Sequence, residues 1–130
     1  MNATGVKVVD ASAVAAIMLD EAEAEDIARR LRGAMLIAPG LLGFEIANVC
    51  LTKLRRHPDL RDRILQALAI QGGLTIETAE VDHVGVVALA DQLRLTGYDA
   101  SYLWLAQRLN AELVTLDRRL ARVAGGFPAG

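Results

Sequence analysis

The sequence predicts an α/β fold with a parallel sheet, on two observations. Short β-branched runs alternate with longer helical patterns, and this alternation favours parallel strands joined through helices. The chain has 130 residues, enough to bury most of its apolar surface in one domain, which we expect to span residues 1–130. Since the composition is 53% hydrophobic but only 4% aromatic, the core must be built from Ala, Val, Leu and Ile.

The strands are expected where short apolar runs occur. They cover residues 6–9, 35–38, 74–77 and 113–116. Pro39 and Gly40 break the second run. The tail from Gly125 to Gly130 is rich in glycine and is expected to be frayed.

Helical patterns fill the segments between these runs. The expected helices cover residues 13–19, 21–32, 41–56, 59–71, 79–96, 99–110 and 118–123. Ser12 is expected to cap the first helix. The second begins with Glu and ends with Arg, which matches the helix macrodipole, and Gly33 stops it. The third ends at His57, because the residue before a proline avoids the helical conformation, and Gly97 is expected to end the fifth.

Composition restricts the compartment. Cys50 is the only cysteine, which excludes an internal disulfide and fits a reducing environment. No run approaches the roughly 20 apolar residues that span a bilayer. The start of the chain, Met1 to Gly5, has neither the basic nor the apolar region of a signal peptide. We therefore expect a cytoplasmic protein without a membrane segment.

Four acidic residues stand where a buried parallel sheet tolerates them poorly: Asp10, Glu45, Asp99 and Asp117. Asp10 and Asp117 directly follow expected strands. Asp99 begins a helix, so it should lie toward the same edge, where the ligand crevice of a parallel sheet forms. Glu45 is on the apolar side of its helix. If these acids meet, only protons or a divalent cation can relieve their repulsion.

Four carboxylates from separate segments form a hard-oxygen site suited to Mg²⁺ or Mn²⁺. Such a site can activate water and neutralise charge on a phosphodiester oxygen. Ser12 and Thr115, each two residues from a candidate ligand, could orient the carboxylates or hold waters. The sequence is therefore typical of a metal-dependent phosphodiesterase.

Each acid also has an ordinary structural interpretation. Asp10, Asp99 and Asp117 could each be no more than a helix cap. Glu45 is the hardest to explain in that way, since Glu is rarely buried without a partner. The two histidines and the cysteine are isolated in the sequence and do not indicate a zinc site. The joint arrangement of the four acids favours the catalytic interpretation.

The net charge of −2 conceals an excess of cations outside these acids. Fourteen Lys and Arg face sixteen Asp and Glu, and setting aside the four acids leaves 14 − 12 = +2. All the cations except Lys7 and Lys53 are arginines, whose planar fork suits phosphate, although a GC-rich coding bias gives the same skew.

Four segments resemble the PIN domain, and more narrowly the VapC toxins of bacterial type II toxin–antitoxin pairs. They are Val8 to Ala13, Glu45 to Val49, Tyr98 to Tyr102 and Leu113 to Asp117, and Gly97 to Leu120 is the most specific stretch. The resemblance covers nearly the whole chain. It implies a three-layer PIN-like fold in which a central parallel sheet is flanked by helices.

The resemblance also implies a metal-dependent endoribonuclease that uses Mg²⁺ or Mn²⁺ and metal-activated water. Asp10 and Asp99 would be the principal metal ligands, and Glu45 and Asp117 would complete the acidic pocket, as ligands or through water. It further implies a homodimer, an RNA substrate and inhibition by a VapB-like antitoxin. The C-terminal segment of that antitoxin would lie along the early helices, whose apolar face comprises Val14, Ile17, Met18, Ile27 and Leu31; core packing is the simpler interpretation of most of these residues.

One feature departs from the family pattern. PIN domains usually add a short strand after the fourth acid, and Val123 to Gly130 offers little β-forming sequence.

Two other functions are excluded by single positions. A receiver domain needs a lysine late in the chain, but Lys53 is the last lysine here, and a haloacid-dehalogenase phosphatase needs Asp at the position that Ser12 occupies. A housekeeping RNA-processing PIN nuclease and a non-catalytic PIN-like binding module remain as alternatives. Arg118, Arg119 and Arg122 are candidate RNA-phosphate contacts.

Overall fold

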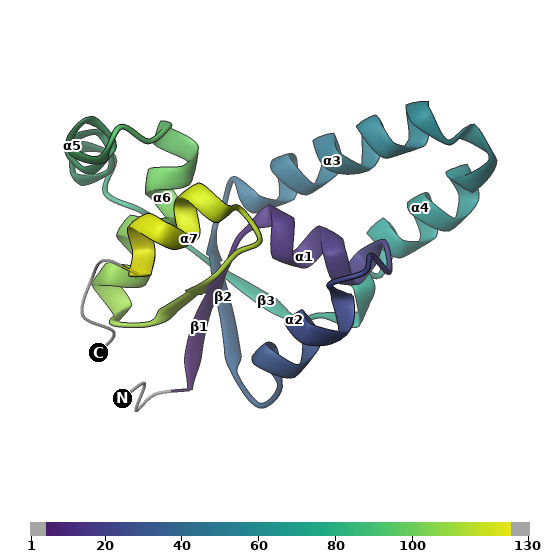
Figure 1. Ribbon diagram of the computed structural model, residues 1–130, viewed down its shortest axis with the longest axis horizontal. Helices are drawn as coiled ribbons and strands as arrows, with labels where there is room; N and C mark the ends of the chain where they lie inside the picture. The colour runs from purple at the N-terminus through teal and green to yellow at the C-terminus, as the bar shows by residue number, and fades with distance from the viewer. Residues whose placement is uncertain (1–4, 126–130) are drawn as a thin grey trace.

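A computed structural model describes residues 5–125, and its centre is a four-stranded parallel sheet (Figure 1). The strands are β1 (Val6–Val9), β2 (Met35–Pro39), β3 (Ile76–Ala79) and β4 (Glu112–Val114), in the spatial order β3-β2-β1-β4. Helices cover both faces, so the expected three-layer α/β architecture is confirmed. The expected fraying at Gly125 to Gly130 falls outside the described residues, except that Gly125 ends the last helix.

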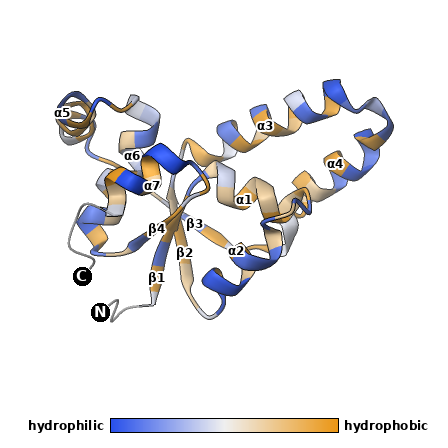
Figure 2. Cartoon of the chain, viewed as in Figure 1, coloured by the Kyte–Doolittle hydropathy of each residue, from blue (hydrophilic) through white to orange (hydrophobic). Residues whose placement is uncertain are grey.

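The interior strand β1 carries two completely buried residues. Val8 pairs with Ile37 on one side and with Leu113 on the other. Val8 and Val9 are both 0% exposed although they point to opposite faces of the sheet. Burial on both faces is the reason why a strand of a parallel sheet reads as a continuous apolar run. Figure 2 shows a similar distribution, with mostly hydrophobic strands at the centre and most of the hydrophilic residues on the surrounding helices.

The helices follow the expected order with shifted ends. They are α1 (Ala11–Met18), α2 (Ala24–Leu31), α3 (Leu42–Arg56), α4 (Arg61–Ala69), α5 (His83–Leu93), α6 (Gly97–Leu109) and α7 (Arg118–Gly125), with short 3₁₀ turns at Pro58–Leu60 and Gln71–Gly73. The predicted C-terminal end of α3 is confirmed: the helix ends at Arg56, and His57, which precedes a proline, is not helical.

Three expectations about helix ends were wrong. The cap of α1 is Asp10, whose carboxylate accepts from the backbone N–H of Ala13, and not Ser12. The second helix begins at Ala24 rather than at residue 21, because Asp20, left-handed at φ 52°, and Glu21 belong to the turn that closes α1, where the Glu21 N–H donates to the Ala16 carbonyl. Arg94, also left-handed, ends α5, and Gly97 instead begins α6.

The ends of two strands also differ from the predicted positions. β3 starts two residues later than residue 74, and β4 ends at Val114 rather than at Leu116. After Val114 the Thr115 hydroxyl accepts from the backbone N–H of Asp117, a local hydrogen bond that competes with strand pairing. The chain therefore turns away from the sheet at Thr115.

The face of the early helices that was expected to offer a groove is mostly core. Val14, Met18, Ile27 and Leu31 are all less than 9% exposed, and only Ile17 is half-buried. The expected absence of β structure after the fourth acid holds as far as the structure describes the chain, because α7 continues to Gly125. Within residues 5–125 no helix combines the length and the apolar character needed to cross a membrane.

Candidate active site

Asp10 lies at the carboxyl end of the central strand β1 and is 6% exposed. One carboxylate oxygen, Oδ1, accepts from the Ser12 hydroxyl (2.7 Å) and from the Ala13 N–H (3.1 Å). The other, Oδ2, accepts from the Thr115 hydroxyl. Burial raises the pKa of Asp10 and the charge of Asp117 adds to this, while the three hydrogen bonds act in the opposite direction.

Ser12 and Thr115 join the ends of β1 and β4 around Asp10. The Ser12 Oγ accepts from the Leu116 N–H (2.9 Å), and the Thr115 Oγ1 accepts from the Asp117 N–H (3.0 Å). The expectation that these hydroxyls orient a carboxylate is met for Asp10. They also fix the loop that carries Asp117 to the strand end that carries Asp10.

We expect Thr115→Val to destabilise the protein by about 1–3 kcal/mol, because the Asp117 N–H loses its acceptor and the buried Asp10 loses a donor. Thermal or urea unfolding followed by circular dichroism measures the change. Thr52→Val, at an exposed position of α3, is the matched control and should change stability by less than about 0.5 kcal/mol. Equal stabilities of the two variants would contradict a supporting role for Thr115.

Glu45 is half-buried in the first turn of α3. Its Oε1 accepts from the hydroxyl of Tyr102 at 2.6 Å, and Tyr102 itself is 1% exposed. Burial raises the pKa of Glu45, the Tyr102 hydrogen bond lowers it, and the charges of Asp99 and Asp10 raise it further. The tyrosine supplies the partner that a partly buried Glu requires.

Tyr102 is the site residue that sequence reasoning missed. Its only signal was its position three residues after Asp99, which places the two side chains on neighbouring parts of one helix surface. A buried tyrosine hydroxyl needs a hydrogen-bond partner, but the partner lies 57 residues away in the sequence.

Asp99 lies in the first turn of α6 and does not cap it. Thr96 is the cap, since its hydroxyl accepts from the Asp99 N–H at 3.1 Å. The interpretation of Asp99 as a mere cap is therefore wrong. Burial raises the pKa of Asp99, and the charges of Asp117 and Asp10 raise it further, while Arg119 lowers it.

Asp117 is the most open of the four acids. Its side chain is exposed, and its Oδ1 accepts from the Leu120 N–H (3.0 Å) in the first turn of α7. The capping interpretation is thus correct for Asp117 and for Asp10. It does not exclude a second role, because a carboxylate oxygen has two lone pairs and one hydrogen bond leaves the other free.

The fold brings the four acids within electrostatic range of one another. Asp10 interacts with Glu45, Asp99 and Asp117, and Asp99 also interacts with Glu45 and Asp117. The donor set, all carboxylate oxygen, fits a hard divalent cation. In the described part of the chain, however, no three Asp, Glu, His or Cys side chains are already assembled as a chelating group.

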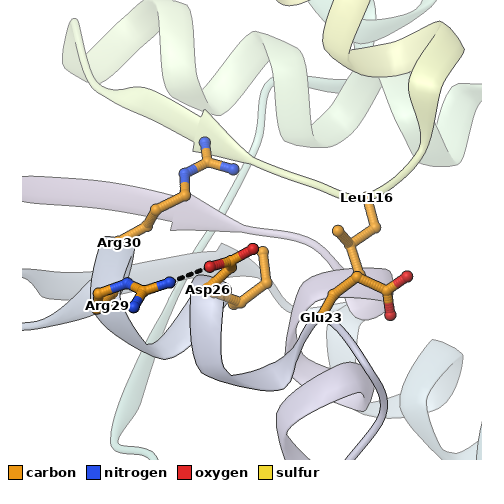
Figure 3. Close-up of a pocket in the computed structure, with 6 residues that line it drawn as sticks. Glu23, Asp26, Arg29, Arg30 and Leu116 are labelled. Atoms are coloured by element: carbon orange, nitrogen blue, oxygen red, sulfur yellow. Dashed lines mark hydrogen bonds and ion pairs between the residues drawn. The ribbon is translucent and has the colours of Figure 1, made fainter.

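Two surface cavities lie outside the acidic cluster. The first, of about 450 Å³, is lined by Glu23, Asp26, Ile27, Arg29, Arg30 and Leu116 (Figure 3). An Arg29–Asp26 ion pair lies along its α2 side, and Leu116 faces α2 from the loop before Asp117. The second, of about 550 Å³, is lined by residues of α5, of the turn that follows it and of the start of α6. Neither cavity contains any of the four acids.

A sequence profile of the PIN domain matches residues 7–126, which include all four acids. The chain belongs to the PIN-domain family. The match to the family extends over both halves of the sheet and every segment on which the resemblance was based.

The relatives of this PIN domain are VapC proteins. It is 34% identical over 127 residues to "Ribonuclease VapC3" of Pyrobaculum aerophilum, which covers 94% of this chain and 95% of the relative. It is 37% identical over 119 residues to "Ribonuclease VapC9" of Mycobacterium tuberculosis, covering 88% and 87% of the two chains. The crystal structure of PAE2754 from Pyrobaculum aerophilum is similar, with a TM-score of 0.65 and 26% identity over 92% of this chain and 81% of the other.

Proposed function

We propose that this PIN domain is the toxin of a VapBC-type toxin–antitoxin pair, an endoribonuclease that hydrolyses RNA phosphodiester bonds with Mg²⁺ or Mn²⁺. The similarity to VapC ribonucleases over nearly the full length of both chains supports the ribonuclease activity. The observation that carries the metal dependence is the buried carboxylate of Asp10, which interacts electrostatically with three further carboxylates.

Asp10, Glu45, Asp99 and Asp117 would hold the ion, with Asp10 and Asp99 as the principal ligands. When bound, the ion supplies an activated water and neutralises charge on the phosphodiester oxygens. No covalent nucleophile is needed, and the buried Cys50, whose pKa is raised by burial, is unsuited to that role.

The residues around the acids position them. Ser12 and Thr115 hold both oxygens of Asp10, and Tyr102 holds Oε1 of Glu45. The interaction of Arg119 with Asp99 places a permanent positive charge beside the acids, where it can attract an RNA phosphate. Supporting groups of this kind typically change metal affinity or activity by about 10–100-fold.

Cleavage of total cellular RNA by the purified protein tests the activity. We expect cutting in Mg²⁺ or Mn²⁺ and none in EDTA, with activity restored when the metal is added back. Cutting that persists in EDTA would contradict the metal-dependent mechanism. If the protein cuts none of the cellular RNAs under any metal condition, the result would favour the binding-module alternative.

The toxin role includes a cytoplasmic location, a homodimer and a VapB-like antitoxin that blocks the nuclease. Induced expression in a bacterium should arrest growth, and co-expression of a cognate VapB-like antitoxin should relieve the arrest. A nuclease that cuts RNA in vitro without affecting growth would instead support the housekeeping alternative.

A further inference from the structure

The turn between α3 and α4 carries a cluster of arginines that the proposed function does not use. The chain leaves the sheet along α3 and returns toward it along α4, so this turn projects from the molecule (Figure 1). Arg55 and Arg56 end α3, and Arg61 and Arg63 lie in the first turn of α4; all four side chains are exposed. We call residues 55–63 the hairpin tip.

The four arginines of the hairpin tip form no ion pair with any residue that the structure describes. The ion pairs found there join other cations to acids: Lys7 and Arg30 to Glu112, Arg29 to Asp26, and Lys53 to Glu21. Asp59 and Asp62 are the only acids of the hairpin tip, which therefore has a net charge of +2, with His57 neutral, in a chain whose net charge is −2. The hairpin tip is a positive surface without internal neutralisation.

The stability of the two helices explains only half of this cluster. Arg55 and Arg56 lie in the last turn of α3, where the helix dipole favours positive charge. Arg61 and Arg63 lie in the first turn of α4, where the dipole disfavours it, and no side chain caps that helix start. Asp62 offsets one of these two charges. Exposed cations that the fold itself disfavours are expected where a ligand uses them.

The hairpin tip is firmly held but presents no large apolar surface. Leu60 packs against the core and Ile64, just after the tip, is 3% exposed. No large apolar side chain within the tip is exposed, and the nearest ones, Leu51 and Leu65, lie outside it. The centre of a protein–protein interface is usually apolar and depleted of charge. A rigid, charged tip without such a centre favours a hydrophilic polyanion over a protein partner.

The hairpin tip is remote from the acidic cluster. Glu45 and Arg56 are 11 positions apart on the same helix, and a rise of 1.5 Å per residue separates them by about 16 Å. This separation is about twice the Debye length of about 8 Å at physiological salt. The arginines therefore do not neutralise the acids, and the acids hardly repel an anion that is bound at the tip.

We propose that the hairpin tip is an anchoring site for the phosphate backbone of RNA, away from the bond that the acids cleave. This inference rests on the proposed ribonuclease function and adds a second binding site to it. The planar guanidinium of arginine binds phosphate oxygens through two parallel hydrogen bonds. Phosphate contacts fix the position of a nucleic acid but carry no sequence information. The hairpin tip thus adds affinity for RNAs that extend beyond the acidic cluster, whatever their sequence.

The experiment removes the two arginines that helix stability does not explain, in the double variant Arg61→Gln/Arg63→Gln. Arg61→Lys/Arg63→Lys keeps both charges. Arg32→Gln/Arg108→Gln is the matched control, because it removes two charges at exposed positions outside the tip and the acidic cluster. The probe is a fluorescently labelled RNA of about 20 nucleotides and mixed sequence, longer than the roughly 4–16 nucleotides of a typical single-strand site. Fluorescence anisotropy in EDTA measures binding without cutting.

We expect Arg61→Gln/Arg63→Gln to bind this RNA about 25-fold more weakly than wild type at about 0.1 M salt, since each phosphate contact contributes about 0.7 to the slope of log affinity against log salt. The slope itself should become shallower by about 1.4. The lysine variant and the control should bind nearly as wild type does. The unfolding temperature of the glutamine variant should not fall, because the removed charges are unfavourable at the start of α4.

Binding in EDTA and cleavage in Mg²⁺ can fail independently. Wild type that cuts RNA, with a glutamine variant that binds as wild type does, would overturn the anchoring site and leave the nuclease standing. An equal loss in the glutamine variant and the control would reduce the effect to overall charge and would also overturn it. Binding that depends on Arg61 and Arg63, with no cutting in any metal, would support the anchoring site and overturn the nuclease.

A protein partner at the hairpin tip is the remaining outcome. If the glutamine variant binds RNA as wild type does but no longer binds a VapB-like antitoxin, the tip is a protein-binding surface and the proposal is wrong. Isothermal titration with the purified antitoxin makes this comparison.

Discussion

Asp99→Asn is expected to reduce RNA cleavage by at least about a hundred-fold and to leave the protein folded. The substitution keeps the size of the side chain and removes its charge, which a hard cation requires. The helix start is preserved, because Thr96 caps α6 through the backbone N–H of residue 99. Cleavage of a defined RNA in Mg²⁺, together with circular dichroism of both proteins, makes the comparison.

Asp91→Asn is the matched control, since Asp91 is an exposed acid on α5 outside the cluster, and it should cut as wild type does. Asp10→Asn should also abolish cleavage, but it alters the cap of α1 and the bond to Thr115 as well. Glu45→Gln should reduce cleavage sharply while its amide oxygen still accepts from Tyr102. Equal cutting by Asp99→Asn and wild type would show that the activity arises elsewhere or from a contaminant.

Divalent metal is expected to stabilise the wild-type protein strongly. At a metal concentration 100 times the dissociation constant, binding to the folded state alone adds about 2.7 kcal/mol, or roughly 10 °C in unfolding temperature for a chain of this size. Asp99→Asn should show little of this increase. Thermal unfolding with Mg²⁺, Mn²⁺ and EDTA measures both proteins, and equal shifts in the two would exclude Asp99 as a ligand.

In EDTA, without metal, Asp99→Asn should be at least as stable toward unfolding as the wild-type protein. The pKa values of Asp10, Glu45 and Asp99 are raised in the folded protein, first by burial and then by neighbouring carboxylates. Folding therefore favours their protonated forms, and the stability that they contribute is present at acidic pH and is lost as pH rises through the raised pKa values.

The advantage of Asp99→Asn in EDTA should thus be largest near neutral pH and should shrink as pH falls toward about 3, below the ordinary pKa values of Asp and Glu, where the carboxylates are mostly protonated in both states. Urea unfolding at several pH values measures this difference. A metal-free wild type that is clearly more stable than Asp99→Asn at neutral pH would identify Asp99 as a structural partner and not a ligand.

The positions of Asp10 and Asp117 could be predicted from local sequence. Each follows an apolar run that the sheet buries, and parallel strands place their carboxyl ends at one edge. The spacing of the helical pattern likewise located α3, and the proline after His57 located its end at Arg56. Capping could not be chosen in advance between Asp10 and Ser12, because both side chains can accept from a helix N–H and only the backbone direction after β1 decides between them.

The sequence by itself determined the α/β class and the four acids, because hydrophobic periodicity and strand-end positions are local properties of the chain. Only the tertiary structure decided the strand order β3-β2-β1-β4, the bond from Tyr102 to Glu45 and the bonds that hold Asp10 to Thr115. These contacts join residues 57 and 105 positions apart. No local pattern encodes them, since they depend on which strands lie side by side and on how the helices pack against them.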